Sequence, residues 1–116
     1  RCELLSEPTT AAAEVAGIVN ATPVGMTGYE GLPLDPALVQ PAHFVADVIY
    51  TPIDTAFVKA AQAKQCRTMN GGGMCVHQAA EAFRHFTGRA ADVERMRRTF
   101  AAACTKQANT PQEEVP

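Results

Sequence analysis

Short apolar runs that stop near proline alternate with amphipathic segments along this chain. The first run, Val15–Asn20, is followed by Pro23, and proline cannot continue a hydrogen-bonded ladder, so the run is typical of a strand buried on both faces. The second run, Phe44–Tyr50, is rich in branched and aromatic residues and ends before Pro52. The third is the short segment Cys66–Met69. The pattern therefore predicts three strands.

Helical periodicity and turn residues fill the intervals between these runs. Asp35 before Pro36 predicts a single helical turn, and either Asp54 or Thr55 can cap a helix that runs to about Gln65. A strand, a helix and a strand in this order imply a parallel crossover.

Two further helices with apolar stripes follow the third strand. The first begins at Gly73 and ends at Gly88, which is placed to adopt a left-handed conformation. Its stripe consists of Val76, Ala79, Ala80, Phe83 and Phe86. The second begins at Asp92 and ends near Cys104. Its apolar face consists of Val93, Met96 and Phe100. The fold class predicted from these elements is α/β.

Composition narrows the class of protein. The 116 residues are 47% hydrophobic and carry a formal net charge of -2, so the chain can bury one modest core. It lacks the basic character that nucleic acid selects, and acidic residues interrupt every apolar run well before the roughly 20 residues that span a bilayer. We expect neither nucleic acid nor membrane as a partner. Residues 1–104 are predicted to form one domain, and residues 105–116 a loose polar tail.

The cysteines lack the spacing of a disulfide framework or a metal site. Cys2, Cys66, Cys75 and Cys104 include no C-x-x-C pair, so they are expected to be buried or free thiols of a reducing, cytoplasmic compartment. Cys75 and His77 form the tightest pair of soft ligands, but a closed zinc site needs four. No metal is predicted. No signal peptide is expected at the start, and Arg1 in the first position favours a trimmed or partial chain.

Polar side chains and glycines follow each predicted strand. In open parallel sheets, ligands bind beyond the carboxyl ends of the strands, where these segments would meet. Asn20 and Thr22 offer hydrogen-bonding groups after the first strand, and Tyr50 offers a phenol after the second. Gln78 is expected to aim its amide at the same crevice. The glycines 71–73 allow close backbone approach, although on their own they are equally typical of a tight connection.

Taken together, these motifs resemble the C-terminal part of the shikimate/quinate dehydrogenase family. The matching segments, within roughly Val15–Phe100, are Asn20–Met26, Asp47–Pro52 with Thr55, Gly71–Met74, and Gln78–Ala80 with Phe83. The resemblance implies an incomplete Rossmann-like three-layer parallel sheet, the C-terminal part of an NAD(P)-binding domain. Asn70, Gly72 and Cys75 depart from the family's common residues, and together with Arg95–Phe100 in the last helix they favour a quinate/shikimate type over the biosynthetic type.

The resemblance also implies roles for individual residues. The residues that it places against NADP or NAD are Asn20, Ala21, Thr22, Val48, Gly71 and Met74. Tyr50 and Gln78 would contact the carboxylate or hydroxyls of a shikimate-like or quinate-like ring. The sequence leaves open which nucleotide and which ring acid are used, and whether the protein is a homodimer.

The reaction that the resemblance implies is reversible hydride transfer between the nicotinamide and a ring hydroxyl or ketone of shikimate, dehydroshikimate or quinate. The family's acid/base lysine and aspartate belong to an N-terminal substrate domain and have no counterpart here, so no catalytic residue is predicted and the chain alone is predicted to be inactive. Two alternatives stay open. One is a non-catalytic ligand-binding module, and the other is a subunit that needs a separate N-terminal chain to cover the edge of its first strand.

Overall fold

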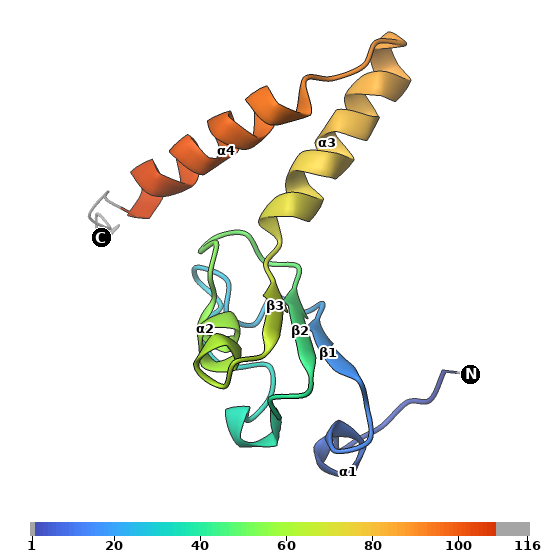
Figure 1. Ribbon diagram of the computed structural model, residues 1–116, viewed down its shortest axis with the longest axis vertical. Helices are drawn as coiled ribbons and strands as arrows, with labels where there is room; N and C mark the ends of the chain where they lie inside the picture. Colours follow the sequence, from blue (N-terminus) through green and yellow to red (C-terminus); the bar gives the residue numbers. More distant parts are fainter. Residues whose placement is uncertain (1, 109–116) are drawn as a thin grey trace.

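The computed structural model describes residues 2–108, which form a parallel three-stranded sheet with helices. The strands lie in the order β1 (Gly17–Asn20), β2 (Phe44–Asp47) and β3 (Arg67–Met69). The helices are α1 (Thr9–Ala12), the single turn η1 (Pro36–Leu38), α2 (Ala56–Ala63), α3 (Gly72–Thr87) and α4 (Val93–Ala108). Figure 1 shows α1 and α2 beside the sheet, whereas α3 and α4 rise from the end of β3 as a helical hairpin. The prediction of an α/β fold with three parallel strands is confirmed.

The two faces of the sheet differ in how they are covered. Ile18 aligns with Val45, and Val45 is buried in a core with Phe57 of α2. The opposite face carries Val19 and Met69, which are 56% and 65% exposed. Within residues 2–108, helices therefore cover one face, and the chain supplies two layers of the predicted three-layer fold.

Thr55 begins α2. Its Oγ1 accepts a hydrogen bond from the Val58 N–H at 3.2 Å, which is the usual contact of a threonine N-cap. Asp54, the other candidate cap, instead accepts a hydrogen bond from Asn70 Nδ2 at 3.1 Å. The structure thus selects one of the two caps that the sequence left open, and it gives Asp54 a partner at the start of α3.

The strand predicted over Phe44–Tyr50 is too long. It ends at Asp47, because the Asp47 carboxylate accepts the Ile49 N–H at 2.9 Å and turns the chain out of the sheet. α1 was not predicted, since its N-cap position holds Pro8 and no side chain caps it.

The α3–α4 hairpin matches its predicted start and turn but not all of its predicted stripe. Gly88 ends α3 with φ 69°, and Val76 and Ala80 are buried, as predicted. Phe83 and Phe86 continue the predicted stripe but are 44% and 89% exposed, so the stripe is buried only in part. The physical reason is that no described element lies over the last turn of α3.

The last helix runs further than predicted. α4 continues to Ala108, past the predicted end near Cys104, and the Thr105 hydroxyl donates to the Ala101 carbonyl at 3.0 Å within it. The first residues of the predicted tail are therefore helical, and residues 109–116 lie outside the described part of the chain.

Candidate functional site

A buried polar network joins the ends of β1 and β2. Asn20 is 3% exposed, and its Nδ2 donates to both carboxylate oxygens of Asp47 at 3.2 Å and to the Val24 carbonyl at 3.0 Å. Asp47 also accepts from the Ile49 N–H at 2.9 Å and from Thr55 Oγ1 at 2.8 Å. Three donor groups thus converge on one buried carboxylate. A carboxylate suits this position because its ionised form accepts hydrogen bonds and donates none. The network fixes the loop after β1 against the start of α2.

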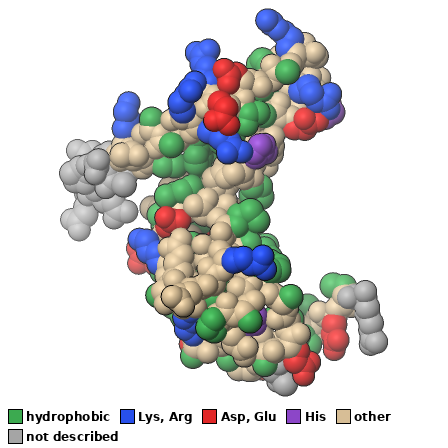
Figure 2. Space-filling model, viewed as in Figure 1, with side chains coloured by type: hydrophobic (Ala, Val, Ile, Leu, Met, Phe, Trp, Pro, Cys, Tyr) green, Lys and Arg blue, Asp and Glu red, His purple; other side chains and the backbone are tan. Residues whose placement is uncertain are grey.

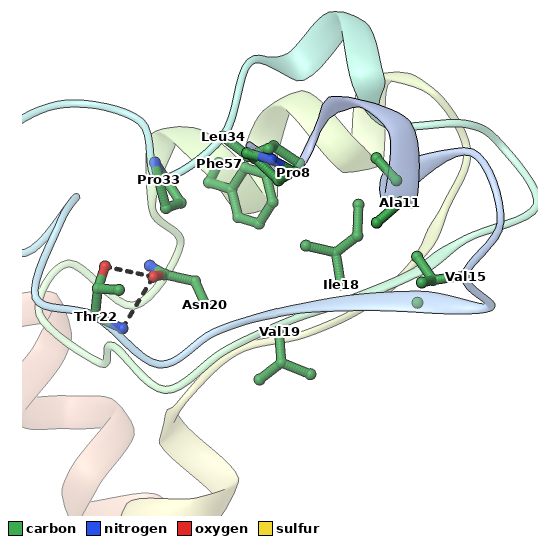
Figure 3. Close-up of a pocket in the computed structure, with 12 residues that line it drawn as sticks. Pro8, Ala11, Val15, Ile18, Val19, Asn20, Thr22, Pro33, Leu34 and Phe57 are labelled. Atoms are coloured by element: carbon green, nitrogen blue, oxygen red, sulfur yellow. Dashed lines mark hydrogen bonds between the residues drawn. The ribbon is translucent and has the colours of Figure 1, made fainter. Parts of the chain in front are cut away.

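The same network sets the shape of the segment after β1. Because the Asn20 Nδ2 faces Asp47, the Asn20 Oδ1 points to Thr22, where it accepts from the N–H at 3.1 Å and from Oγ1 at 2.7 Å (Figure 3). Ala21 and Thr22 are exposed beyond this turn. The sequence predicted a hydrogen-bonding amide at a ligand crevice, but the Asn20 amide is used internally, and Ala21 and Thr22 are the residues that face outward.

The backbones that follow β2 and β3 touch at Val48 and Gly71. The Gly71 N–H donates to the Ile49 carbonyl at 3.0 Å. A Cβ on Gly71 would lie 2.2 Å from the Val48 carbonyl oxygen, which no side chain can occupy without a shift of the backbone. Glycine at 71 is therefore required by close approach, and the structure brings these two predicted site residues together.

Tyr50 and Met74 follow this junction closely in the chain, Gln78 lies further along α3, and all three side chains are exposed. Tyr50 is 43% exposed, and its ring packs edge-on against Phe100 of α4 with centroids 6.1 Å apart. Met74, 48% exposed, and Gln78 are one turn apart on the same face of α3. No hydrogen bond within residues 2–108 joins Tyr50 to Gln78, so a ligand crevice shared by both stays a prediction.

A cavity of about 350 Å³ lies along the free edge of β1 (Figure 3). Its lining is mainly apolar and includes Ile18, Leu34 and Phe57, with Asn20 and Thr22 at one end. The other predicted site residues do not line it. A few polar groups at one end do not suit a hydroxylated ring, which needs hydrogen bonds around its circumference, so this cavity is distinct from the predicted crevice.

Comparisons with known proteins decide the family. Residues 71–99 match the family model described as Shikimate 5'-dehydrogenase C-terminal domain. The NADP(+) shikimate dehydrogenase of Arthrobacter sp. strain FB24 is 54% identical over 84 residues, covering 72% of this chain and 29% of that protein. The NAD(+) quinate/shikimate dehydrogenase of Corynebacterium efficiens is 51% identical over 94 residues, covering 81% of this chain and 32% of that protein.

A solved structure agrees with these relatives. The quinate dehydrogenase of Corynebacterium glutamicum, in complex with NAD, superposes with a TM-score of 0.78 and 45% identity, covering 82% of this chain and 34% of that one. The chain belongs to the shikimate/quinate dehydrogenase family, as its C-terminal part. The predicted family and the incomplete Rossmann-like fold are both confirmed. The chain spans about a third of the length of these dehydrogenases.

Lys59 on α2 and Lys64 at the end of α2 lie away from the carboxyl ends of the strands. Lys64 Nζ donates to the carbonyls of Pro36 and Val39, the second at 2.8 Å, and so holds η1 in place. Lys59 is exposed on α2. Neither is placed to exchange a proton with a ligand beside Gly71.

The charged side chains and the histidines of the α3–α4 hairpin are spread over its surface. Arg97 Nη2 lies 2.8 Å from His77 Nε2, and the hydrogen bond from Arg84 lowers the pKa of the exposed Glu81 carboxyl. On the face drawn in Figure 2, acidic groups lie among the Lys and Arg side chains instead of leaving one basic patch. Among the described residues, no three His, Cys, Asp or Glu side chains gather as metal ligands, all four cysteines are free, and no helix is long and apolar enough to cross a membrane.

Proposed function

We propose that this chain is the cofactor-side part of an NAD(P)-dependent shikimate/quinate dehydrogenase. The whole enzyme would transfer a hydride reversibly between the nicotinamide and a ring hydroxyl or ketone of shikimate, dehydroshikimate or quinate. The observation that carries the proposal is the Val48–Gly71 junction at the carboxyl ends of a parallel sheet, where ligands of such folds bind.

The residues at this edge fit a nicotinamide cofactor. Ala21 and Thr22 are exposed on a turn that the buried Asn20 amide holds rigid, and Gly71 leaves no side chain between the strands' last carbonyls and a flat ligand. Met74, half exposed one turn into α3, would pack beside the ring. When bound, the cofactor would accept or donate the hydride, and these residues would hold it against the sheet.

The substrate contacts would come from Tyr50 and Gln78. A phenol and a primary amide supply both donors and acceptors, which a hydroxylated ring acid requires, because each buried unpaired polar group costs about 1–3 kcal/mol. Phe100 supports the Tyr50 ring from the side, so the phenol is held while its hydroxyl end is left for a ligand. Shikimate and quinate are both compatible with this pair.

Proton transfer would depend on an N-terminal substrate domain outside this chain. The open face of the sheet, with Val19 and Met69 exposed, and the cavity at the edge of β1 favour a partner segment that completes the sheet. The chain by itself would then be inactive. The same features support the second candidate, a subunit that takes its N-terminal part from a separate chain. The free thiols support a cytoplasmic location.

A chimera tests this function. The C-terminal segment of the Corynebacterium glutamicum quinate dehydrogenase would be replaced by this chain, and oxidation of quinate and shikimate would be followed with NAD and NADP. We expect activity, and we expect Tyr50→Phe and Gln78→Ala each to lower kcat/KM about tenfold or more. Gln62→Ala on α2 is the matched control and should leave kcat/KM unchanged, because the exposed Gln62 side chain bonds Thr68 of β3 and none of the proposed site residues. A chimera that folds with normal circular dichroism but oxidises neither acid would refute the proposal.

A further inference from the structure

The α3–α4 hairpin meets the rest of the chain at a narrow joint (Figure 1). Gly71 donates its N–H to Ile49, and the Tyr50 ring packs on Phe100. Asn70, the residue before Gly71, makes a third contact. α3 packs mainly on α4 and not on the sheet, so the joint consists of these contacts and of the close approach of Ile53 to Gly72.

Asn70 uses both ends of its amide. Its Nδ2 donates to Asp54 Oδ1 at 3.1 Å, and its Oδ1 accepts from the Gly72 N–H at 3.2 Å, at the first turn of α3. Asp54 lies in the loop that leads from Tyr50 to the cap of α2. Only an amide can serve both partners, since an aspartate at 70 could accept from Gly72 but would place a second carboxylate against Asp54.

Arg97 is the cation to consider as a partner for a carboxylate introduced at position 70. It lines the same cavity as Asn70, from α4. However, its Nη2 already lies 2.8 Å from His77 Nε2, and its Nε lies 4.0 Å from Glu94. An added carboxylate at position 70 would lie within hydrogen-bond distance of Asp54, whereas the contacts of Arg97 go to His77 and Glu94 on the hairpin.

The joint separates two groups of proposed ligand contacts. Ala21, Thr22, Val48 and Tyr50 belong to the sheet side, whereas Met74 and Gln78 belong to α3. We propose that Asn70 and Asp54 are positioning residues, whose amide–carboxylate hydrogen bond sets the angle at which α3 presents Met74 and Gln78 to Tyr50. The consequence for catalysis rests on the proposed function, but the effect on the angle of α3 does not.

The test compares Asn70→Asp, Asp54→Asn and the double variant in the 116-residue chain. We would measure amide exchange at Gly71 and the nuclear Overhauser contacts between the Tyr50 and Phe100 rings. N70D should speed exchange at Gly71 about tenfold and weaken the ring contacts, because two carboxylates repel across the joint. D54N should resemble the parent chain, since an asparagine oxygen at 54 can still accept from Asn70.

The double variant decides the outcome. N70D/D54N exchanges the two groups, so it should restore both readouts even if N70D alone unfolds. Gln65→Glu, which adds one charge at an exposed site beyond α2, is the control for charge alone and should change neither readout. The proposal is overturned if N70D behaves as the parent chain, or if the double variant is as impaired as N70D. In the active chimera, N70D should lower kcat/KM about tenfold, and the double variant should restore it. An inactive parent chimera would refute the proposed function and leave the exchange result standing.

Discussion

Asp47 illustrates how one side chain can end a strand and organise a site. The sequence pattern runs on to Tyr50 because Val48 and Ile49 are good strand residues, but the buried carboxylate takes the Ile49 N–H out of the ladder. The same carboxylate binds Asn20 and Thr55 from two other elements. Neither role could be predicted from the sequence, since each depends on partners that are distant along the chain.

Asp47→Asn should destabilise the chain by about 1–3 kcal/mol, because an amide at this position turns a donor toward one of the three donors that now converge there. Unfolding in urea measures the loss. Asp35→Asn is the matched control, since Asp35 is exposed and its oxygen caps only η1, where asparagine caps equally well. Equal stability of Asp47→Asn and the parent chain would mean that the network contributes nothing.

Gly71→Ala and Gly73→Ala should have opposite effects. At Gly71 a Cβ would meet the Val48 carbonyl at 2.2 Å, so we expect a loss of about 1–3 kcal/mol. At Gly73 nothing lies within 4 Å of the added Cβ and the residue is helical, so we expect a gain of about 0.5–1 kcal/mol. Thermal and urea unfolding of the two variants check both signs, and a loss at Gly73 equal to that at Gly71 would contradict the geometry.

At the scale of the elements, the sequence predicted the features that depend on residues close together in the chain. The three strands, the α2 cap candidates and the left-handed end of α3 follow from periodicity, proline, threonine and glycine. What the sequence did not predict depends on tertiary contacts. Phe86 continues a perfect helical stripe, yet no described element covers it. α1 forms without a capping side chain, and α4 passes its predicted end because no stop signal lies at Cys104.

Gly88→Ala tests the end of α3. Gly88 has φ 69° and open space around its Cα, so an alanine there costs only backbone strain, about 1 kcal/mol. Gly88→Asn should cost less than alanine, because asparagine tolerates the left-handed region better. Urea unfolding orders the three chains, and an alanine variant as stable as the parent would show that α3 does not need this cap.

At the scale of the whole molecule, the chain combines a half-covered sheet with a hairpin attached at one joint. Of the residues that follow the strands, the structure places Val48 after β2 against Gly71 after β3. The sequence could not predict the angle of α3, because a few contacts around Asn70 and Phe100 set that angle. The meeting of Tyr50 and Gln78 on one ligand depends on this angle and stays a prediction.

The claim that this chain is the cofactor-side part of the enzyme is tested most directly by assaying hydride transfer with two separate polypeptides. This chain, the N-terminal part of the Corynebacterium glutamicum quinate dehydrogenase, and a mixture of the two would each be assayed with quinate or shikimate and with NAD or NADP. We predict that reduced cofactor forms only in the mixture, because the proposed function assigns the proton-transferring groups and the nicotinamide contacts to different pieces. Turnover by this chain alone would contradict the account.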